Sequence, residues 1–134
     1  MKIAVVGTGG VGGYFGGLLA QAGHDVSFVA RGAHLRAIRA RGLRVESPDG
    51  GFVVAPADAT DDPSDIGPVE LVLLCVKTYD LDAAIEQMRP LVGPGTSVLT
   101  LQNGVEAPGQ VGAAYGEQTA LAGLVYSEVS VREP

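Results

Sequence analysis

Cysteine, histidine and aromatic residues are scarce in this sequence. Its 134 residues include 1 Cys, 2 His and no Trp, and aromatic residues make up only 5%. The lone Cys75 excludes an internal disulfide, and no cluster of His, Cys and carboxylates has metal-ligand spacing, so we expect no metal site. There is neither a signal peptide nor an apolar run near the roughly 18 residues that span a membrane, so we expect a cytoplasmic location without a membrane partner.

Positive charge is also in short supply. The chain has 9 Lys and Arg against 15 Asp and Glu, which gives a net charge of −6 and a pI near 4.7. This balance argues against a nucleic-acid partner, because binding to phosphates over a large surface needs basic residues. A hydrophobic content of 46% is typical of a soluble α/β enzyme, and the length predicts one domain over residues 1–134.

Glycine, by contrast, is abundant, and its spacing near the N-terminus is informative. A short apolar run, a predicted strand, ends at Val6, and Gly7, Gly9 and Gly12 follow it as G-x-G-x-x-G. A chain with 20 glycines produces this spacing by chance. Here, however, the motif follows a strand and opens an amphipathic helix that Gly23 ends. That context favours a dinucleotide loop over a turn with structural duties alone.

Each glycine of the motif has a separate predicted task. Gly7 lets the chain turn out of the strand, Gly9 leaves room between the backbone and the phosphates, and Gly12 lets the helix pack closely on the sheet. The N–H groups at the start of the helix then face the anion. The predicted pyrophosphate-binding residues are Gly7, Thr8, Gly9, Gly10, Val11 and Gly12.

The end of the second predicted strand indicates which dinucleotide binds. An NAD site usually carries Asp or Glu there, to accept hydrogen bonds from the ribose 2′-OH. This chain has Arg31 instead, and a guanidinium suits a 2′-phosphate. NADP(H) is therefore the predicted cofactor, in preference to NAD(H) or FAD, and the alternative is an exposed surface arginine. Gly32 and His34 are weaker candidates for lining the adenosine end, and His34 is otherwise a helix-surface group.

The periodicity along the chain predicts an α/β fold of the Rossmann type, with a doubly wound, mostly parallel sheet and helices on both faces. A hairpin is expected at 43–47 and 52–54, and 59–68 is expected to be a connection with a helical turn near 63–66. The other predicted strands are 1–6, 24–31, 70–76, 96–101 and one or two within 119–131; the other predicted helices are 14–22, 33–41, 80–91 and 105–115.

Two polar residues follow predicted strands at the edge where an open α/β sheet binds its ligands. Lys77 comes directly after the apolar strand that contains Cys75, and its ammonium could reach a ribose, a phosphate or an anionic substrate. The alternative for Lys77 is a solvated strand end. Asn103 precedes a helix, so it could be an N-cap, an amide that contacts cofactor or substrate, or both. Cys75 itself is predicted to pack in the core.

Four separated motifs resemble the amino-terminal half of the ketopantoate reductase (2-dehydropantoate 2-reductase) family. They are GTGGVGGYFG at 7–16, GHDVSFVARG at 23–32, LCVKTY at 74–79 and LQNGV at 101–105. Enzymes of this family reduce 2-dehydropantoate to pantoate with NADPH, on the route to pantothenate and coenzyme A. The resemblance implies that residues 7–12 hold the pyrophosphate and Arg31 the 2′-phosphate. It also implies that Lys77 and Asn103 lie at the nicotinamide end, near the substrate.

The sequence departs from the family in one respect. Family members continue into a helical second domain, which supplies a general-acid lysine and an acidic residue that binds the substrate hydroxyl. No residue here matches those two positions, and residues 129–134 resemble the strand before the last hairpin of the nucleotide domain. We therefore expect a domain truncated near its C-terminal end, which supplies the NADP(H)-binding half and is inactive alone.

Two alternatives to this function stay open. The chain could be a stand-alone NADP(H)-binding module without catalysis, or part of a reductase that acts on another 2-oxo acid. For both reductase possibilities, the expected partner is a small-molecule 2-oxo acid substrate. Because a truncated sheet exposes apolar surface, association with the missing helical domain or with a second copy is also expected.

Overall fold

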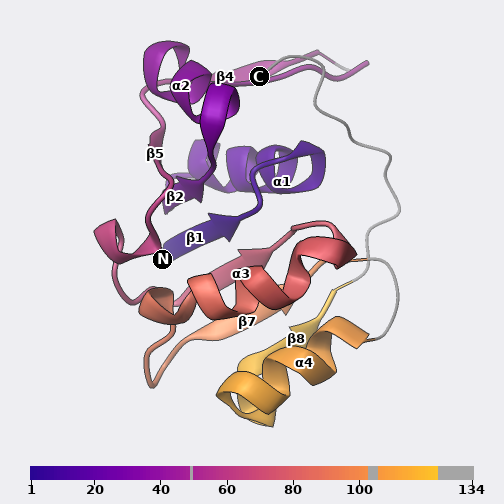
Figure 1. Ribbon diagram of the computed structural model, residues 1–134. Coiled ribbons are helices and arrows are strands. Elements are labelled where there is room, and N and C mark those ends of the chain that lie inside the picture. The colour runs from indigo at the N-terminus through magenta and orange to yellow at the C-terminus, as the bar shows by residue number, and fades with distance from the viewer. Residues whose placement is uncertain (49, 103–105, 124–134) are drawn as a thin grey trace.

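A parallel sheet organises the chain in the computed structural model, which describes residues 1–48, 50–102 and 106–123 (Figure 1). Within these residues the sheet has six strands in the order β5-β2-β1-β6-β7-β8, and each neighbouring pair is parallel. All the carboxyl ends therefore lie at one edge. The strands are β1 (Lys2–Val6), β2 (Asp25–Val29), β5 (Asp58–Thr60), β6 (Leu71–Leu74), β7 (Ser97–Thr100) and β8 (Ala120–Ala122).

The order of the strands reverses between β1 and β6. From β1 the chain builds outward through β2 to β5, then crosses to β6 on the other side of β1 and builds outward again. In open α/β sheets, ligands bind beside such a switch point, outside the carboxyl ends of the strands. The predicted Rossmann-type architecture is thus confirmed. The helices are α1 (Gly10–Gln21), α2 (Gly32–Arg41), α3 (Leu81–Gln87) and α4 (Glu106–Tyr115).

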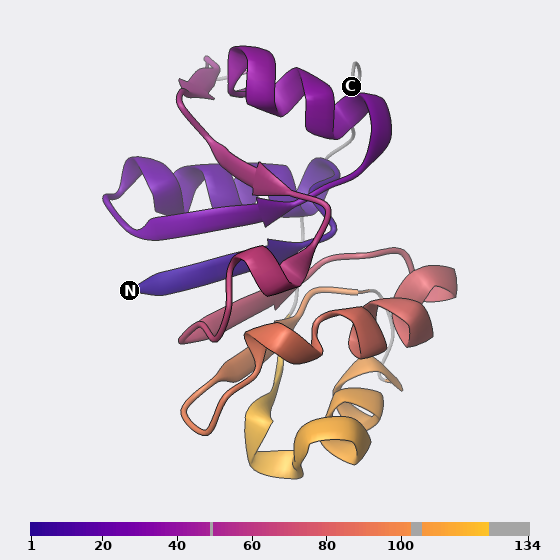
Figure 2. The same cartoon turned by 60° about the vertical axis from the view of Figure 1, so that its left-hand side comes forward.

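The two faces of the sheet form separate hydrophobic clusters, because side chains alternate along each strand. On β1, Ile3 and Val5 join the cluster that contains α2, whereas Ala4 and Val6 join the cluster that contains α3 and α4. Figure 2 shows α1 and α2 at one end of the molecule and α3 and α4 at the other. The sheet is therefore covered on both faces.

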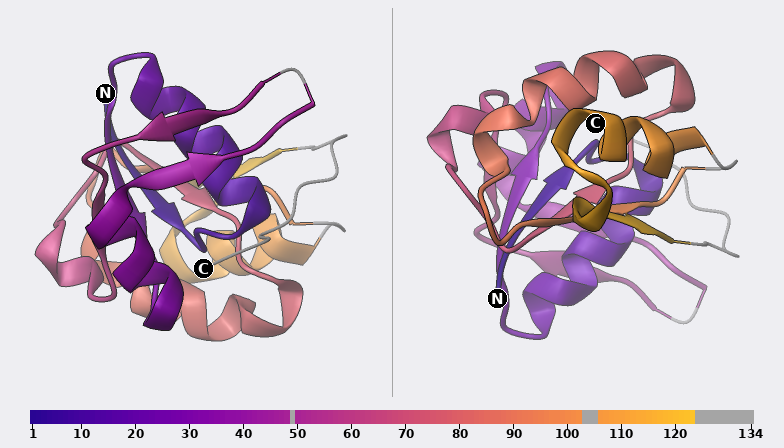
Figure 3. Two further views of the ribbon diagram at one scale, coloured as in Figure 1. Left: turned by 90° about the horizontal axis from the view of Figure 1, so that it is seen from above. Right: turned by 90° about the horizontal axis from the view of Figure 1, so that it is seen from below.

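Strands β3 (Leu43–Val45) and β4 (Phe52–Val54) form the predicted antiparallel hairpin, which is a separate sheet from the main one. Phe52 packs against the second half of α1, where a Cβ added to Gly17 would lie 2.7 Å from the Phe52 ring. Figure 3 shows the hairpin beside α1 in its left view, and α4 nearest the viewer in its right view. The hairpin thus covers the flank of α1 that adjoins its sheet-facing side.

Two predicted elements were wrong. Strand β5 falls partly in the predicted connection 59–68, and it pairs with β2 although it has only three residues and no apolar alternation. In β5, the Asp58 carboxylate accepts a hydrogen bond of 2.7 Å from Ser27 Oγ on β2. Local sequence does not predict this contact, because it joins residues that are distant in the chain. The helix predicted at 80–91 ends at Gln87, and a 3₁₀ turn, Arg89–Leu91, follows because Pro90 cannot continue the helix.

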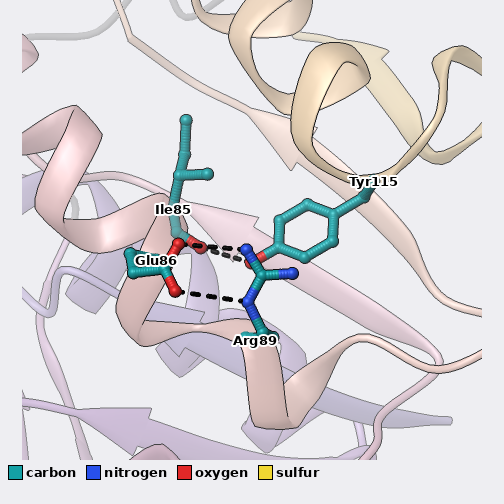
Figure 4. A network of polar contacts seen from close by, with 4 residues as sticks. All are labelled: Ile85, Glu86, Arg89 and Tyr115. Atoms are coloured by element: carbon teal, nitrogen blue, oxygen red, sulfur yellow. Dashed lines mark hydrogen bonds and ion pairs between the residues drawn. The ribbon is translucent and has the colours of Figure 1, made fainter.

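Helices α3 and α4 are joined by polar contacts at their outer surface (Figure 4). The hydroxyl of Tyr115 on α4 donates a hydrogen bond to the carbonyl of Ile85 on α3. Arg89 lies over the Tyr115 ring, 5.2 Å from its centre, and pairs with Glu86 at 3.0 Å between Nη2 and Oε2. The Arg89 guanidinium lowers the pKa of Glu86, and partial burial raises the pKa of Tyr115. These contacts fix the two helices on one face of the sheet.

Candidate functional site

The glycine loop lies at the switch point between β1 and β6. Gly7 has a φ of +90°, a conformation that a side chain would strain. A Cβ there would also lie 2.7 Å from the backbone nitrogen of Val76, just beyond β6. The loop is therefore pressed against the exit of the neighbouring strand, and glycine is required for the turn.

Gly12 lies in a tightly packed position, whereas Gly9 faces open space. A Cβ on Gly12 would lie 2.2 Å from the Gly7 carbonyl oxygen and 2.9 Å from Val5 Cγ1, so helix α1 begins in direct contact with the loop and β1. A Cβ on Gly9 would meet nothing within 4 Å in the part of the chain described. Close packing at Gly12 and open space at Gly9 are what a loop needs to bring its backbone up to a ligand.

The first turn of α1 has the features of an anion site. Its N-cap is Gly9, which has no side chain to cap the free N–H groups, and the first turn contains no acidic residue. Unpaired N–H groups at a helix N-terminus carry partial positive charge, which attracts phosphate. The dinucleotide phosphates that the sequence predicts therefore fit this position.

The loop is held by its second residue, Thr8, which is 4% exposed. The Thr8 hydroxyl donates a hydrogen bond of 2.9 Å to the carbonyl of Val29, at the end of β2. The Thr8 carbonyl is hydrogen-bonded to Nε2 of His34, in the first turn of α2. His34 is therefore a half-buried contact of the loop, and the prediction of a helix-surface group was wrong. No local pattern in the sequence indicates this contact, because it joins residues that are 26 positions apart.

Arg31 lies where the sequence places a 2′-phosphate contact. It is the N-cap of α2, with an extended backbone (φ −145°, ψ 163°), and lies just beyond β2, separated from Val29 by Ala30. The side chain is exposed and makes no hydrogen bond or ion pair with the described residues. Arg39 on the same helix differs, since its Nε donates to the carbonyl of Ala59 at 3.1 Å. The Arg31 guanidinium is thus free to bind an anion at the carboxyl edge of the sheet.

The exit of β6 carries the second group of candidates. Lys77 is exposed and has extended backbone angles, and its side chain forms no hydrogen bond or ion pair with the described residues. Asn103 lies outside the described residues. Its neighbour Gln102 donates from Nε2 to the carbonyls of Leu74 (2.8 Å) and Val76 (3.2 Å). Gln102 thereby ties the exit of β7 to the strand end that precedes Lys77, a role that the sequence analysis missed.

Cys75 lies between the loop and the sheet. It is half-buried, its Cβ lies 3.3 Å from where a Cβ on Gly12 would stand, and burial raises the pKa of its thiol to about 12. A thiol with so high a pKa is a poor nucleophile at neutral pH. The side chain therefore contributes packing beneath the loop, as predicted.

Two further observations concern metal ligands and membrane spans among the described residues. No group of three or more His, Cys, Asp or Glu residues among them could hold a metal ion. None of the helices in the described ranges has the length and apolar character that crossing a membrane requires.

The fold and the loop together define the class of the protein. A parallel sheet with a glycine loop at its switch point, followed by a helix with a free N-terminus, is the Rossmann type of α/β domain. Comparison with known proteins then identifies the family: the ketopantoate reductase PanE/ApbA family matches residues 3–134. The chain belongs to this family.

Individual relatives agree with the family match. The chain is 37% identical to 2-dehydropantoate 2-reductase from Mesorhizobium japonicum, over 100% of this chain and 47% of the relative. The enzyme of the same name from Caulobacter vibrioides is 42% identical over 78% of this chain and 34% of the relative. A PanE/ApbA family ketopantoate reductase from Ralstonia eutropha superposes with a TM-score of 0.89, at 38% identity, over 100% of this chain and 44% of that one. The chain thus spans less than half the length of these relatives.

Proposed function

We propose that residues 1–134 form the NADP(H)-binding half of a reductase that converts 2-dehydropantoate to pantoate with NADPH, in pantothenate and coenzyme A biosynthesis. The observation that carries this proposal is Arg31, an arginine without a partner among the described residues at the end of β2, beside the glycine loop. Membership of the ketopantoate reductase family supports the reaction. A basic side chain where NAD-binding proteins carry an acidic one supports the phosphorylated cofactor.

Each predicted residue has a role in this proposal. The backbone of the loop (Gly7, Thr8, Gly9, Gly10, Val11 and Gly12) holds the pyrophosphate at the N-terminus of α1. Arg31 makes charge-assisted hydrogen bonds to the 2′-phosphate. Lys77 and Asn103 contact the nicotinamide ribose and the substrate, beyond the exits of β6 and β7.

The reaction needs a hydride donor and a proton donor. NADPH would supply the hydride when bound. Negative charge would develop on the ketone oxygen, where a positioned proton donor typically contributes about a hundred- to ten-thousandfold in rate. The ammonium of Lys77 is suited to attract the substrate carboxylate toward the strand ends. By family resemblance, the general-acid lysine and the acidic residue for the substrate hydroxyl belong to a helical second domain. We propose that residues 1–134 alone bind cofactor without turnover.

Calorimetric titration of the chain with NADPH and with NADH tests the cofactor proposal. We expect NADPH to bind more tightly than NADH and Arg31→Ala to remove that preference. The substitution should weaken the free energy of NADPH binding by about 1.5–3 kcal/mol, the usual range for hydrogen bonds to charged groups. Arg36→Ala, on the outer surface of the same helix, is the matched control and should keep the preference. Equal affinity for the two nucleotides in the unsubstituted protein would overturn the assignment of NADP(H).

A reductase for another 2-oxo acid is the second candidate, and one comparison favours it. The structure of D-mandelate dehydrogenase with NADH and anilino(oxo)acetate superposes on this chain with a TM-score of 0.83, at 26% identity, over 92% of this chain and 40% of that one. Joining residues 1–134 to the helical half of a relative gives an enzyme in which 2-dehydropantoate and aromatic 2-oxo acids can be compared by kcat/KM. A higher value for the aromatic acids would favour the second candidate.

A stand-alone binding module is the third candidate, and the same joined protein tests it. Turnover that appears only when the helical half is present supports the reductase proposal. Tight NADPH binding, together with no turnover of any 2-oxo acid by the joined protein, would favour the module.

A further inference from the structure

His34 links the two parts of the proposed cofactor site. Its Nε2 is hydrogen-bonded to the carbonyl of Thr8, inside the glycine loop, while its backbone belongs to the first turn of α2. A carbonyl oxygen can only accept, so Nε2 carries the hydrogen and donates it. The bond therefore connects the loop proposed for the pyrophosphate to the helix that begins at Arg31.

The first turn of α2 has no capping contact from a side chain at its N-terminus. Its N-cap, Arg31, makes no side-chain capping hydrogen bond, and no acidic residue lies in the first turn. Arg31 is the N-cap of α2 and His34 is the third residue of the helix, so both belong to the start of α2. The hydrogen bond from His34 to Thr8 thus fixes the part of the helix that carries the guanidinium.

The second ring nitrogen shows that stability alone does not explain a histidine here. Nδ1 of His34 is buried and has no hydrogen-bond partner among the described residues. A buried polar atom without a partner lowers stability. An apolar residue of similar size would avoid that loss, but it would also lose the donor to Thr8.

We propose that His34 is a positioning residue for the cofactor, which couples the grip of Arg31 on the 2′-phosphate to the conformation of the glycine loop. This inference rests on the proposed function, because it assumes that NADPH binds at these two places. The loop and the first turn of α2 are held in register by the His34 bond before the cofactor arrives. Binding both phosphate groups then requires less ordering of the chain.

Nucleotide titrations of variants test the coupling in the full 134-residue chain. His34→Phe keeps a flat ring but removes the donor, and we expect the preference for NADPH over NADH to fall about three- to tenfold, the range that one hydrogen bond usually supplies. His34→Gln retains an N–H that can reach Thr8 and should restore most of the preference. If the Phe ring prevents folding, His34→Ala removes the same donor and favours the helix.

The other histidine supplies the matched control. His24 lies in the turn before β2, where its Nδ1 is 3.3 Å from the N-terminal nitrogen of Met1, at the opposite end of the strand from the loop. His24→Phe should leave the NADPH:NADH affinity ratio unchanged. A purely structural role for His34 would lower the thermal midpoint without changing this ratio.

Combination with Arg31→Ala separates this inference from the proposed function. If His34 acts through Arg31, His34→Phe should have almost no further effect on the affinity ratio in the Arg31→Ala background. An unchanged ratio in folded His34→Phe or His34→Ala, or equal effects with and without Arg31, would overturn the inference and leave the proposed function standing. Failure of the unsubstituted chain to bind either nucleotide would overturn both.

Discussion

The two faces of the sheet are packed in opposite ways. Helix α1 meets its surroundings through four buried glycines, and a Cβ on one of them, Gly16, would lie 2.6 Å from Val5 Cγ2. The opposite face is filled by large aliphatic side chains, and Leu81, Met88 and Val111 from α3 and α4 are at most 2% exposed. One helix is thus held close to the strands, and the others are held away by their side chains.

This difference decides which helix can begin beside the ligand site. A helix packed through glycine can begin directly beside the strand ends, which places its free N–H groups at the switch point. Glycine has no side chain to bury, so the apolar area on this face comes from the strands, from α2 and from partly buried α1 side chains such as Phe15 and Leu19. Substitutions of the α1 glycines, on this glycine face, should therefore impair binding most. Truncations on the aliphatic face, beneath α3 and α4, should impair stability.

The largest effect is expected from Gly12→Val, which would destroy the close packing. The new side chain meets backbone at 2.2 Å, so the start of α1 must move away from the loop. We expect the loss of measurable NADPH binding and a destabilisation of about 3 kcal/mol, the upper part of the usual range for overpacking. Thermal unfolding and calorimetry measure the two effects. Gly9→Ala, in open space, should weaken binding while the thermal midpoint stays unchanged. Wild-type affinity in Gly12→Val would contradict the assigned site.

Met88→Ala tests the aliphatic face. Met88 is fully buried in the cluster beneath α3, and truncation of such a side chain typically costs about 2–5 kcal/mol. Below the unfolding transition, the affinity for NADPH should stay within about twofold of the wild-type value. Met88 and the glycine loop lie on different faces of the sheet, and distant sites usually have independent energetic effects. Denaturant titration with and without nucleotide distinguishes the effects. A large loss of affinity in the folded variant would show that the two faces are coupled.

Tyr115→Phe should have a smaller effect, confined to the same face. It removes the hydroxyl that donates to Ile85 and keeps the ring beneath Arg89. We expect about 1 kcal/mol of destabilisation, the usual net contribution of one hydrogen bond. Chemical denaturation measures it, with Tyr79→Phe as the control because Tyr79 is 86% exposed. Equal stability of Tyr115→Phe and wild type would show that the hydroxyl contributes nothing to the α3–α4 contact.

Cys75 should add a small pH dependence beneath the glycine loop. Folding raises the pKa of its thiol from 9.0 to about 12, so the native state holds this proton more tightly than the unfolded state does. The associated stability is fully present below pH 9 and is lost as the pH rises toward 12. Thermal midpoints between pH 8 and about 11 should fall more steeply for the wild type than for Cys75→Ala. Parallel curves would exclude this contribution.

The glycine loop could be predicted from sequence because its determinants are local. Strand, turn and helix follow one another within residues 2–21. As their spacing predicts, Gly7 and Gly12 lie where a Cβ would clash with neighbouring backbone. The same locality allowed the hairpin and most of the strands to be predicted. Arg31 followed from its position at the end of a strand, and its cofactor role stays a prediction.

The parts that sequence could not supply depend on contacts between distant residues. Strand β5 exists because it pairs with β2, and nothing in its three residues distinguishes it from a loop. His34 and Gln102 each have an ordinary local sequence, and only the fold brings them to Thr8 and to the exit of β6. Lys77 lies just beyond β6, as predicted, and is exposed, whereas Asn103 lies outside the described residues. The roles of both stay predictions.

A nucleotide titration followed by amide NMR is the most direct test of the claim that the glycine face holds the cofactor. With NADPH, we expect shifts to be largest for residues of the loop 7–12 and for Arg31, and smallest for α3 and α4 around Met88. With NADH, the shifts at Arg31 should be reduced. Shifts concentrated instead at the hollow on the β3–β4 hairpin, which Arg44, Ser47 and Phe52 help to line, would contradict the assignment.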